Sequence, residues 1–150
     1  MKKIILSMAL AVAILGSAFA TPAHKEPSVT VKAAFAKEFS EVKDVQWEQA
    51  SEKEGVFQAR FTLNDECLQA FFTEEGEYLG TTRQITVSRL PILASNALAR
   101  KYAGYHIVSV FEYSAPESVS YFITLSNAKG GLLLKTTGNG ELTVYKRIKQ

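Results

Sequence analysis

The second half of this chain repeats the hydrophobic pattern of its first half at a spacing of 63 to 64 residues. At a shift of 63, apolar positions of residues 31–47 fall on apolar positions of residues 94–110. At a shift of 64 the match continues, and Phe57, Ala59 and Phe61 fall on Tyr121, Ile123 and Leu125. Two copies of a unit this long predict a duplicated supersecondary unit that shares one sheet or one core.

Each copy begins with helical periodicity and continues with the period-two alternation of strands. In the first copy, Val31, Phe35 and Phe39 form an apolar stripe within residues 29–42. Alternating apolar residues then predict strands near 45–47, 57–63, 68–72 and 78. In the second copy, Pro91 suits the first turn of a helix that runs to about residue 103. Strands are expected after it at 106–113, 119–127, 131–137 and 141–148.

These elements predict an α+β fold of two tandem repeats, each made of one helix plus four antiparallel strands. One helix on one small sheet leaves much of that sheet exposed to solvent, so the two copies are expected to pair into one sheet. We therefore expect one curved sheet with both helices on one face. The repeats span 28–86 and 88–148, and residues 28–150 form a single duplicated domain.

The N-terminus has the pattern of a secretory signal peptide. Lys2 and Lys3 precede an apolar run over residues 4–15, and Ala18-Phe19-Ala20 provides a small-x-small cleavage site. We predict a signal peptide at 1–20 and a flexible leader at 21–27, with a periplasmic or extracellular destination. The alternative is an uncleaved anchor, for which the apolar run is short, and no second run offers a membrane span.

Charge and cysteine content exclude several classes of protein. The formal net charge of +2 comes from Lys2 and Lys3, so the processed chain is close to neutral and shows no basic stripe for nucleic acid. Cys67 is the only cysteine, so no intramolecular disulfide can form. An unpaired, half-buried thiol is one interpretation of Cys67, and an intermolecular disulfide is the other.

No set of residues predicts catalysis or a cofactor. His24 and His106 are the only histidines, His24 lies in the leader, and no nucleophile motif accompanies His106. Zinc would need more ligands than one cysteine and one ordered histidine. The acidic turns at 52–54 and 74–77 lack the ligand spacing of a calcium loop and are expected to be solvated. We predict no metal, no cofactor and no enzymatic activity.

The sheet face that the helices leave uncovered is the candidate site. Period two sends an aromatic set with interspersed basic residues to this face: Arg60, Phe71, Phe111, Tyr113, Phe122, Lys135, Tyr145 and Arg147. Aromatic residues and arginine carry much of the binding energy at protein interfaces. The alternative is an ordinary sheet face whose aromatic residues stabilise cross-strand pairs.

Five motifs follow one another in a fixed order: the helix aromatics Phe35 and Phe39, the strands 45–47 and 57–61, the turn 76–77, and Leu90-Pro91 at the start of the second helix. This order resembles the PepSY-like domains of the β-lactamase-inhibitor-like (BLIP-like) fold. The resemblance covers residues 29–148. It implies a secreted or periplasmic, non-enzymatic domain, with relatives that bind or inhibit secreted enzymes.

We therefore expect an exported module that binds a protein partner through the uncovered sheet face, as an inhibitor of a secreted enzyme in one form of the hypothesis. The alternative is an envelope sensor or a protein that binds a peptide, lipid or glycan in a cleft between the copies. The residues leave open the partner, the oligomeric state and the role of Cys67.

Overall fold

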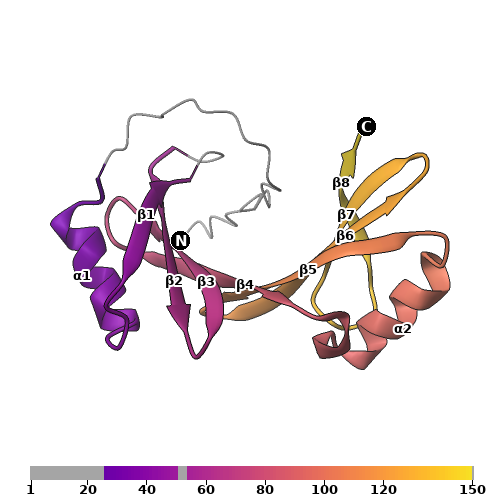
Figure 1. The fold of residues 1–150 in the computed structure, drawn as a ribbon, viewed down its shortest axis with the longest axis horizontal. Coiled ribbons are helices and arrows are strands. Elements are labelled where there is room, and N and C mark those ends of the chain that lie inside the picture. The colour runs from indigo at the N-terminus through magenta and orange to yellow at the C-terminus, as the bar shows by residue number, and fades with distance from the viewer. Residues whose placement is uncertain (1–25, 51–53, 150) are drawn as a thin grey trace, which may run out of the picture.

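The computed structural model of the chain describes residues 26–50 and 54–149 (Figure 1). The predicted signal peptide, His24 and most of the predicted leader lie outside these ranges. Neither of the described α-helices has the length and hydropathy that a membrane crossing requires.

Eight strands form one antiparallel sheet in the order of the chain, from β1 at one edge to β8 at the other. The elements follow in this order: α1 (Val29–Glu38), β1 (Val45–Gln49), β2 (Val56–Leu63), β3 (Glu66–Thr73), β4 (Tyr78–Ile85), a 3-10 turn η1 (Val87–Arg89), α2 (Ile92–Lys101), β5 (His106–Ala115), β6 (Ser118–Asn127), β7 (Gly130–Thr136) and β8 (Thr143–Ile148).

The predicted α+β class of two tandem helix-plus-four-strand repeats is wrong, because the described chain is mostly β. Its body is one continuous eight-stranded sheet with only two α-helices of ten residues each. β4 and β5 pair directly, from Thr81 opposite Ser114 to Ile85 opposite Val110, so strand pairing does not stop at the middle of the chain. The first helix is also shorter than predicted, since Phe39 leaves helical geometry at φ −129° and ψ 57°.

Ser28 caps α1, whereas Pro91 before α2 provides no side-chain cap, and each helix buries one apolar stripe. The Ser28 hydroxyl accepts a hydrogen bond from the backbone N–H of Val31 at 3.3 Å, which caps α1. Pro91 occupies the equivalent position before α2. The stripe of α1 buries Val31 and Phe35, and the stripe of α2 buries small residues and Leu98.

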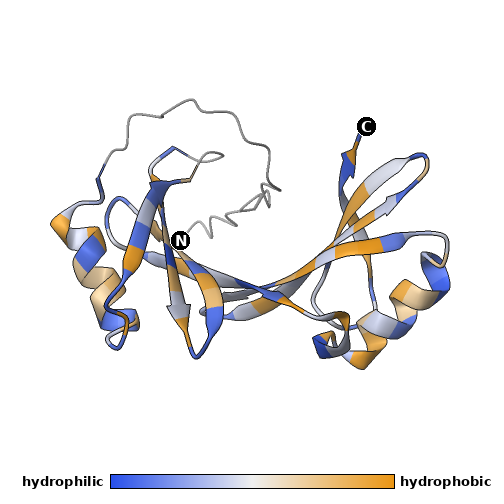
Figure 2. Ribbon diagram, in the orientation of Figure 1, coloured by the Kyte–Doolittle hydropathy of each residue, from blue (hydrophilic) through white to orange (hydrophobic). Residues whose placement is uncertain are grey.

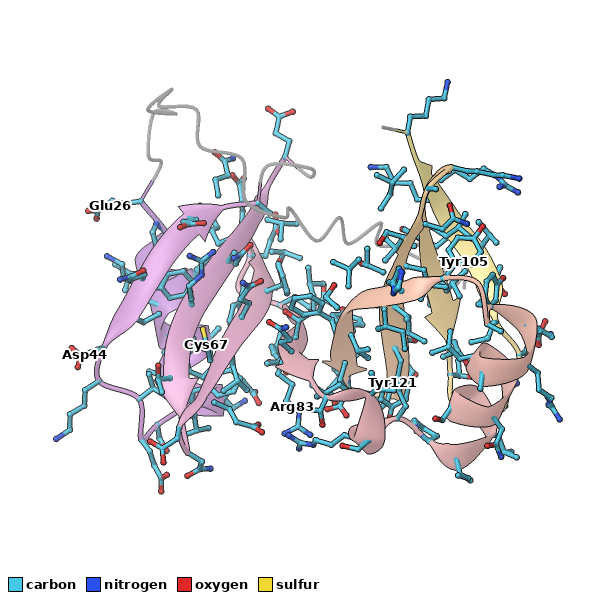
Figure 3. All side chains as sticks on the ribbon, turned by 45° about the vertical axis from the view of Figure 1, so that its right-hand side comes forward. Glu26, Asp44, Cys67, Arg83, Tyr105 and Tyr121 are labelled. Atoms are coloured by element: carbon cyan, nitrogen blue, oxygen red, sulfur yellow. The ribbon has the colours of Figure 1, made fainter. Side chains whose placement is uncertain are left out.

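The hydrophobic core consists of two clusters, one under each helix. The first contains Val31 and Phe35 of α1 with Phe57, Ala59, Phe61, Ala70 and Phe72 of the sheet. The second contains Leu98 of α2 with Ile85, Leu90, Val110, Ile123, Leu125, Leu132 and Leu134. Tyr105 and Tyr121 pack against the second cluster, as Figure 3 shows. Hydrophobic positions alternate with hydrophilic ones along the strands (Figure 2).

Both clusters lie on the same face of the sheet. The strand register shows this. In the first cluster, Ala70 lies opposite Thr81 of β4, and in the second, Ile85 of β4 lies opposite Val110, which lies opposite Ile123. Thr81 and Ile85 are four residues apart in β4 and therefore share a face. The sheet curves so that its outer strands rise on either side of β4 and β5, with both helices outside the curve (Figure 1). Register irregularities in the β3–β4, β5–β6 and β7–β8 pairs supply local bends. We call the inner, concave side the open face.

Candidate functional site

Strand register assigns most of the predicted interface residues to the open face. Paired residues of an antiparallel sheet share a face. A connected series of pairs runs from β2 to β5, in which Arg60 lies opposite Gln69, Gln69 opposite Thr82, and Thr82 opposite Tyr113. Phe111 is two residues from Tyr113 in β5 and shares its face. From there the series continues to β7, because Phe111 lies opposite Phe122 and Phe122 opposite Lys135. Phe71 shares this face because it is two residues from Gln69.

The two predicted residues of β8 are separated by an irregularity in strand pairing. Leu133 lies opposite Lys146 but Leu134 lies opposite Val144, so the pairing register shifts at Tyr145. The Tyr145 ring contacts Phe122 at a centroid distance of 5.6 Å, which places it with the open-face residues. Arg147 lies opposite Leu132, a residue of the second core cluster, so the structure does not bring Arg147 to the open face.

Tyr113 is held rigidly near the centre of the open face. Its hydroxyl donates a hydrogen bond to the carbonyl oxygen of Leu79 at 2.5 Å. Its ring lies against Gly80, where a Cβ atom would come within 2.7 Å of the ring and where φ is +146°. Burial raises the pKa of the Tyr113 hydroxyl, so the phenol keeps its proton and remains a donor. The side chain is half-buried and presents part of a fixed aromatic ring.

A second aromatic group lies toward the β8 end of the open face. The Phe122 ring meets the Tyr145 ring at 84°, an edge-to-face arrangement. The Lys135 ammonium lies 5.7 Å from the centroid of the Phe122 ring, within the range of a cation–π contact. Phe122 itself is only 2% exposed, so Tyr145 and Lys135 are the accessible members of this group.

Two of the predicted contact residues therefore belong to the floor of the face and not to its accessible surface. Phe71 is 3% exposed and lies opposite Gly80, next to the residues that hold Tyr113. Like Phe122, it cannot be a direct contact without rearrangement. Phe111 and Tyr113 are half-buried and remain candidates.

Arg60 lies at the other end of the open face and forms an exposed ion pair. Its guanidinium is 3.8 Å from the carboxylate of Glu48, and both side chains are more than a third exposed. Such a pair contributes little to stability, because water screens both charges. Arg60 is therefore available to exchange Glu48 for another acceptor.

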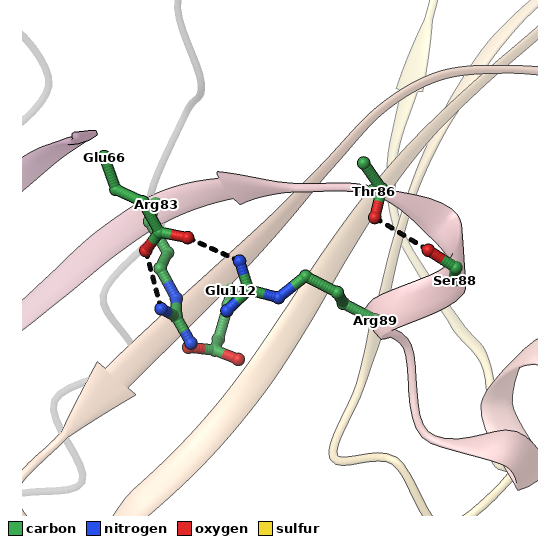
Figure 4. A network of polar contacts seen from close by, with 6 residues as sticks. All are labelled: Glu66, Arg83, Thr86, Ser88, Arg89 and Glu112. Atoms are coloured by element: carbon green, nitrogen blue, oxygen red, sulfur yellow. Dashed lines mark hydrogen bonds and ion pairs between the residues drawn. The ribbon is translucent and has the colours of Figure 1, made fainter. Parts of the chain in front are cut away.

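A charged network that the sequence does not predict lies on the opposite face, since Arg83 is opposite Leu68 and Glu112 in the strand register. Figure 4 shows this network from close by. Arg83 donates to Glu112 at 2.9 Å and to Glu66 at 2.7 Å, and Arg89 donates to the other oxygen of Glu66 at 2.5 Å. These bonds lower the pKa of Glu66, first through Arg89 and then through Arg83. Glu112 and Glu66 raise the pKa of Arg83. Figure 3 shows Arg83 near η1, between the two ends of the sheet.

This network joins three strands and the 3-10 turn where no helix backs the sheet. Its members come from β3, β4, β5 and η1. The only sequence signal for it is the presence of charged residues at core-face positions of strands, where period two predicts apolar ones.

The described residues show no constellation for metal binding. Within ranges 26–50 and 54–149, no group of three or more His, Cys, Asp or Glu residues is placed to hold a metal ion. His106 is exposed at the start of β5. Cys67 is a free thiol, and it is exposed rather than half-buried as its sequence position suggests (Figure 3).

A depression of about 850 Å³ lies beside β1 at one end of the sheet. It is lined by residues 41–46, 60–62 and Cys67. All of these belong to the first half of the chain, so this depression is not the predicted cleft between two copies.

The comparisons with known proteins identify the fold. No protein-family model matches the chain, and no curated protein matches it either. Solved structures do match. A BLIP-like protein from Bacteroides fragilis has a TM-score of 0.73 at 18% identity, covering 85% of this chain and 91% of its own.

Two further structures from the same genus have similar scores. A DUF2874 family protein from Bacteroides ovatus has a TM-score of 0.71 at 22% identity, covering 83% of this chain and 88% of its own. A protein from Bacteroides eggerthii, provisionally described as periplasmic, has a TM-score of 0.74 at 19% identity, covering 83% and 91%. The chain therefore has the BLIP-like fold, and this part of the predicted resemblance is confirmed. The PepSY-like part stays a prediction.

Proposed function

We propose that this protein is an exported, non-enzymatic module that binds a protein partner through its open face. The observation that carries the proposal is the fixed, half-buried ring of Tyr113 at the centre of a concave surface. A side chain that is already held in place loses little conformational freedom on binding. Aromatic residues at the centre of an interface commonly dominate the binding energy.

Two further observations support the proposal. Phe111, Tyr113 and Tyr145 share one face with Lys135 and Arg60, which is the composition typical of protein contacts. One structural neighbour is described as BLIP-like, and an inhibitor of a secreted enzyme is the form of partner binding that this description favours.

The location outside the cytoplasm is part of the same proposal. Its support is the signal-peptide pattern of residues 1–20 and the neighbour provisionally described as periplasmic. Intact-mass measurement of the protein from the cells that produce it should give a chain beginning at Thr21. A chain that keeps residues 1–20 would contradict export by cleavage.

Site-specific photocrosslinking tests the binding face. A photoreactive amino acid replaces Gln84, which is exposed on the open face opposite Phe111, and a matched control replaces Asn96, which is exposed on α2. We expect protein adducts from position 84 and none from position 96. Tyr113→Ala should abolish the adducts while the urea midpoint shows that the protein is still folded. Adducts of equal yield at both positions, or none at position 84, would contradict the proposal.

A further inference from the structure

Charge is divided unevenly between the two halves of the chain. Residues 26–86 hold twelve acidic and six basic residues. After Thr86 only Glu112, Glu117 and Glu141 are acidic, against eight basic residues: Arg89, Arg100, Lys101, Lys129, Lys135, Lys146, Arg147 and Lys149. The near-neutral total therefore conceals an acidic half and a basic half, which gives the molecule a strong charge asymmetry.

Part of the positive charge lies on the open face without a carboxylate partner. Lys135 lies over the Phe122 ring, and Lys146 lies opposite Leu133 on the same face. Among the described residues, the ion pairs involve Arg60, Arg83, Arg89 and Lys32, and none involves Lys135 or Lys146. Three cations of the acidic half, Lys32, Arg60 and Arg83, are thus paired with carboxylates, whereas these two lysines are not.

We infer that the end of the open face formed by Lys135, Tyr145 and Lys146, which we call the basic end, binds an acidic segment of a partner protein. This inference rests on the proposed function and adds the chemistry of the partner. Carboxylates of the segment would meet the two ammonium groups, and an apolar part of it would pack on the Tyr145 ring. Complementary charge of this kind accelerates association and selects the partner.

The geometry favours a protein segment over the other common polyanions. A lipid bilayer is flat at this scale, whereas strand register places Lys135 on the concave face of a curved sheet. A long nucleic acid that reached the basic end would also run along the acidic half of the same sheet and be repelled by it.

The test uses a labelled oligoglutamate peptide as the probe and fluorescence anisotropy as the measurement. The test variant is Lys135→Gln with Lys146→Gln. The matched control is Lys32→Gln with Lys37→Gln, which removes two exposed lysines from α1 and changes the net charge equally. An oligoglutamine peptide of the same length and phosphatidylglycerol vesicles are the comparison probes.

We expect the wild-type protein to bind oligoglutamate at low salt and not oligoglutamine. The test variant should bind about tenfold more weakly, the control variant within about twofold of wild type, and salt should weaken binding as it screens exposed charges. Absence of oligoglutamate binding, equal losses in both variants, or retention on vesicles without peptide binding would overturn the inference.

The same variants separate this inference from the proposed function. Photocrosslinked adducts at position 84 that persist unchanged in the Lys135→Gln, Lys146→Gln protein would overturn the acidic partner and leave the binding face standing. Absence of adducts at position 84 in the wild-type protein contradicts the binding face itself.

Discussion

Gly80 shows how one residue without a side chain determines the position of another. The Tyr113 ring occupies the space that a Cβ atom of residue 80 would need, and the φ of +146° disfavours any L side chain there. Tyr113 can then place its hydroxyl on the Leu79 carbonyl oxygen. A glycine in β4 and a tyrosine in β5 thus form one unit.

We predict that Gly80→Ala lowers the free energy of unfolding by about 2–4 kcal/mol, because backbone strain and overpacking against the ring combine. Urea unfolding measures the loss. Since the ring is the obstacle, Tyr113→Ala in the Gly80→Ala background should cost less than Tyr113→Ala alone.

Gly104 provides the matched control for this substitution. A Cβ atom there meets nothing within 4 Å, so Gly104→Ala should stay within about 1 kcal/mol of wild type. Equal effects at positions 80 and 104 would show that the Tyr113 ring does not restrict residue 80.

At the residue scale, alternation in the sequence predicts the face of a side chain but not its accessibility. Arg60, Phe111, Tyr113 and Lys135 lie on the open face as expected. Arg147 does not, because the pairing irregularity between Leu133 and Leu134 moves it to the core side of β8. The burial of Phe71 and Phe122 depends on cross-strand neighbours, which periodicity within one strand cannot reveal.

The N-terminal cap of α1 is the first feature to test at the scale of the elements. Ser28→Ala removes the oxygen that accepts from the Val31 N–H and should cost about 1 kcal/mol of stability. Ser28→Asp keeps an acceptor at the same place and should restore most of the loss. Equal urea midpoints for Ser28→Ala and wild type would show that the cap does not stabilise α1.

The Glu66 network predicts a pH dependence at the same scale. Its arginine partners lower the pKa of Glu66 in the folded state, so the carboxylate favours folding while it is charged. That stability is present above the ordinary glutamate pKa of about 4.3 and is lost as the pH falls through the lower pKa of the folded protein. Glu66→Gln should reduce stability at neutral pH and flatten its decline in acid, measured by urea unfolding at successive pH values.

Glu75→Gln is the control for the pH experiment, because Glu75 is exposed in the β3–β4 turn and takes part in no described ion pair. Its stability should fall in acid as steeply as that of the wild type. A steep acid decline that survives in Glu66→Gln would assign the effect to other carboxylates.

The locations of helices and strands follow from apolar periodicity, whereas their ends and their long-range pairs do not. Val31 and Phe35 predict α1 correctly, but the end at Glu38 depends on the backbone turn of Phe39. Glu66, Arg83 and Arg89 come together only because β3 pairs with β4 in one register and η1 turns back toward them. The pairing register of β3 and β4 cannot be predicted from the sequence pattern within either strand.

Strand pairing between β4 and β5 and the Glu66 network join the two core clusters at the scale of the whole molecule. Leu134 belongs to the second cluster and is fully buried, while Trp47, the only tryptophan, packs on the first. Because β4 pairs with β5, we predict that Leu134→Ala lowers stability by about 2–5 kcal/mol in both halves at once. The transition followed by Trp47 fluorescence should shift together with that followed by circular dichroism. An unshifted fluorescence transition would mean that the clusters unfold separately.

The predicted fold class was wrong because local patterns do not show how far the sheet continues. Two helical stripes and eight alternating segments suggest two separate repeats, each with a helix and four strands. In the structure the sheet is the larger part, because strands of five to ten residues pair without a break from one edge to the other. Each ten-residue helix covers only part of one face.

The strand order has a consequence for how the chain reaches this structure. Every strand pairs only with its neighbours in the chain, and the longest connection is the one through η1 and α2. Contacts between residues close in sequence need little loop closure, so this sheet should form faster than most all-β folds of its size. No strand needs a distant part of the chain for its pairing, so the sheet can form strand by strand in the order in which the chain is synthesised.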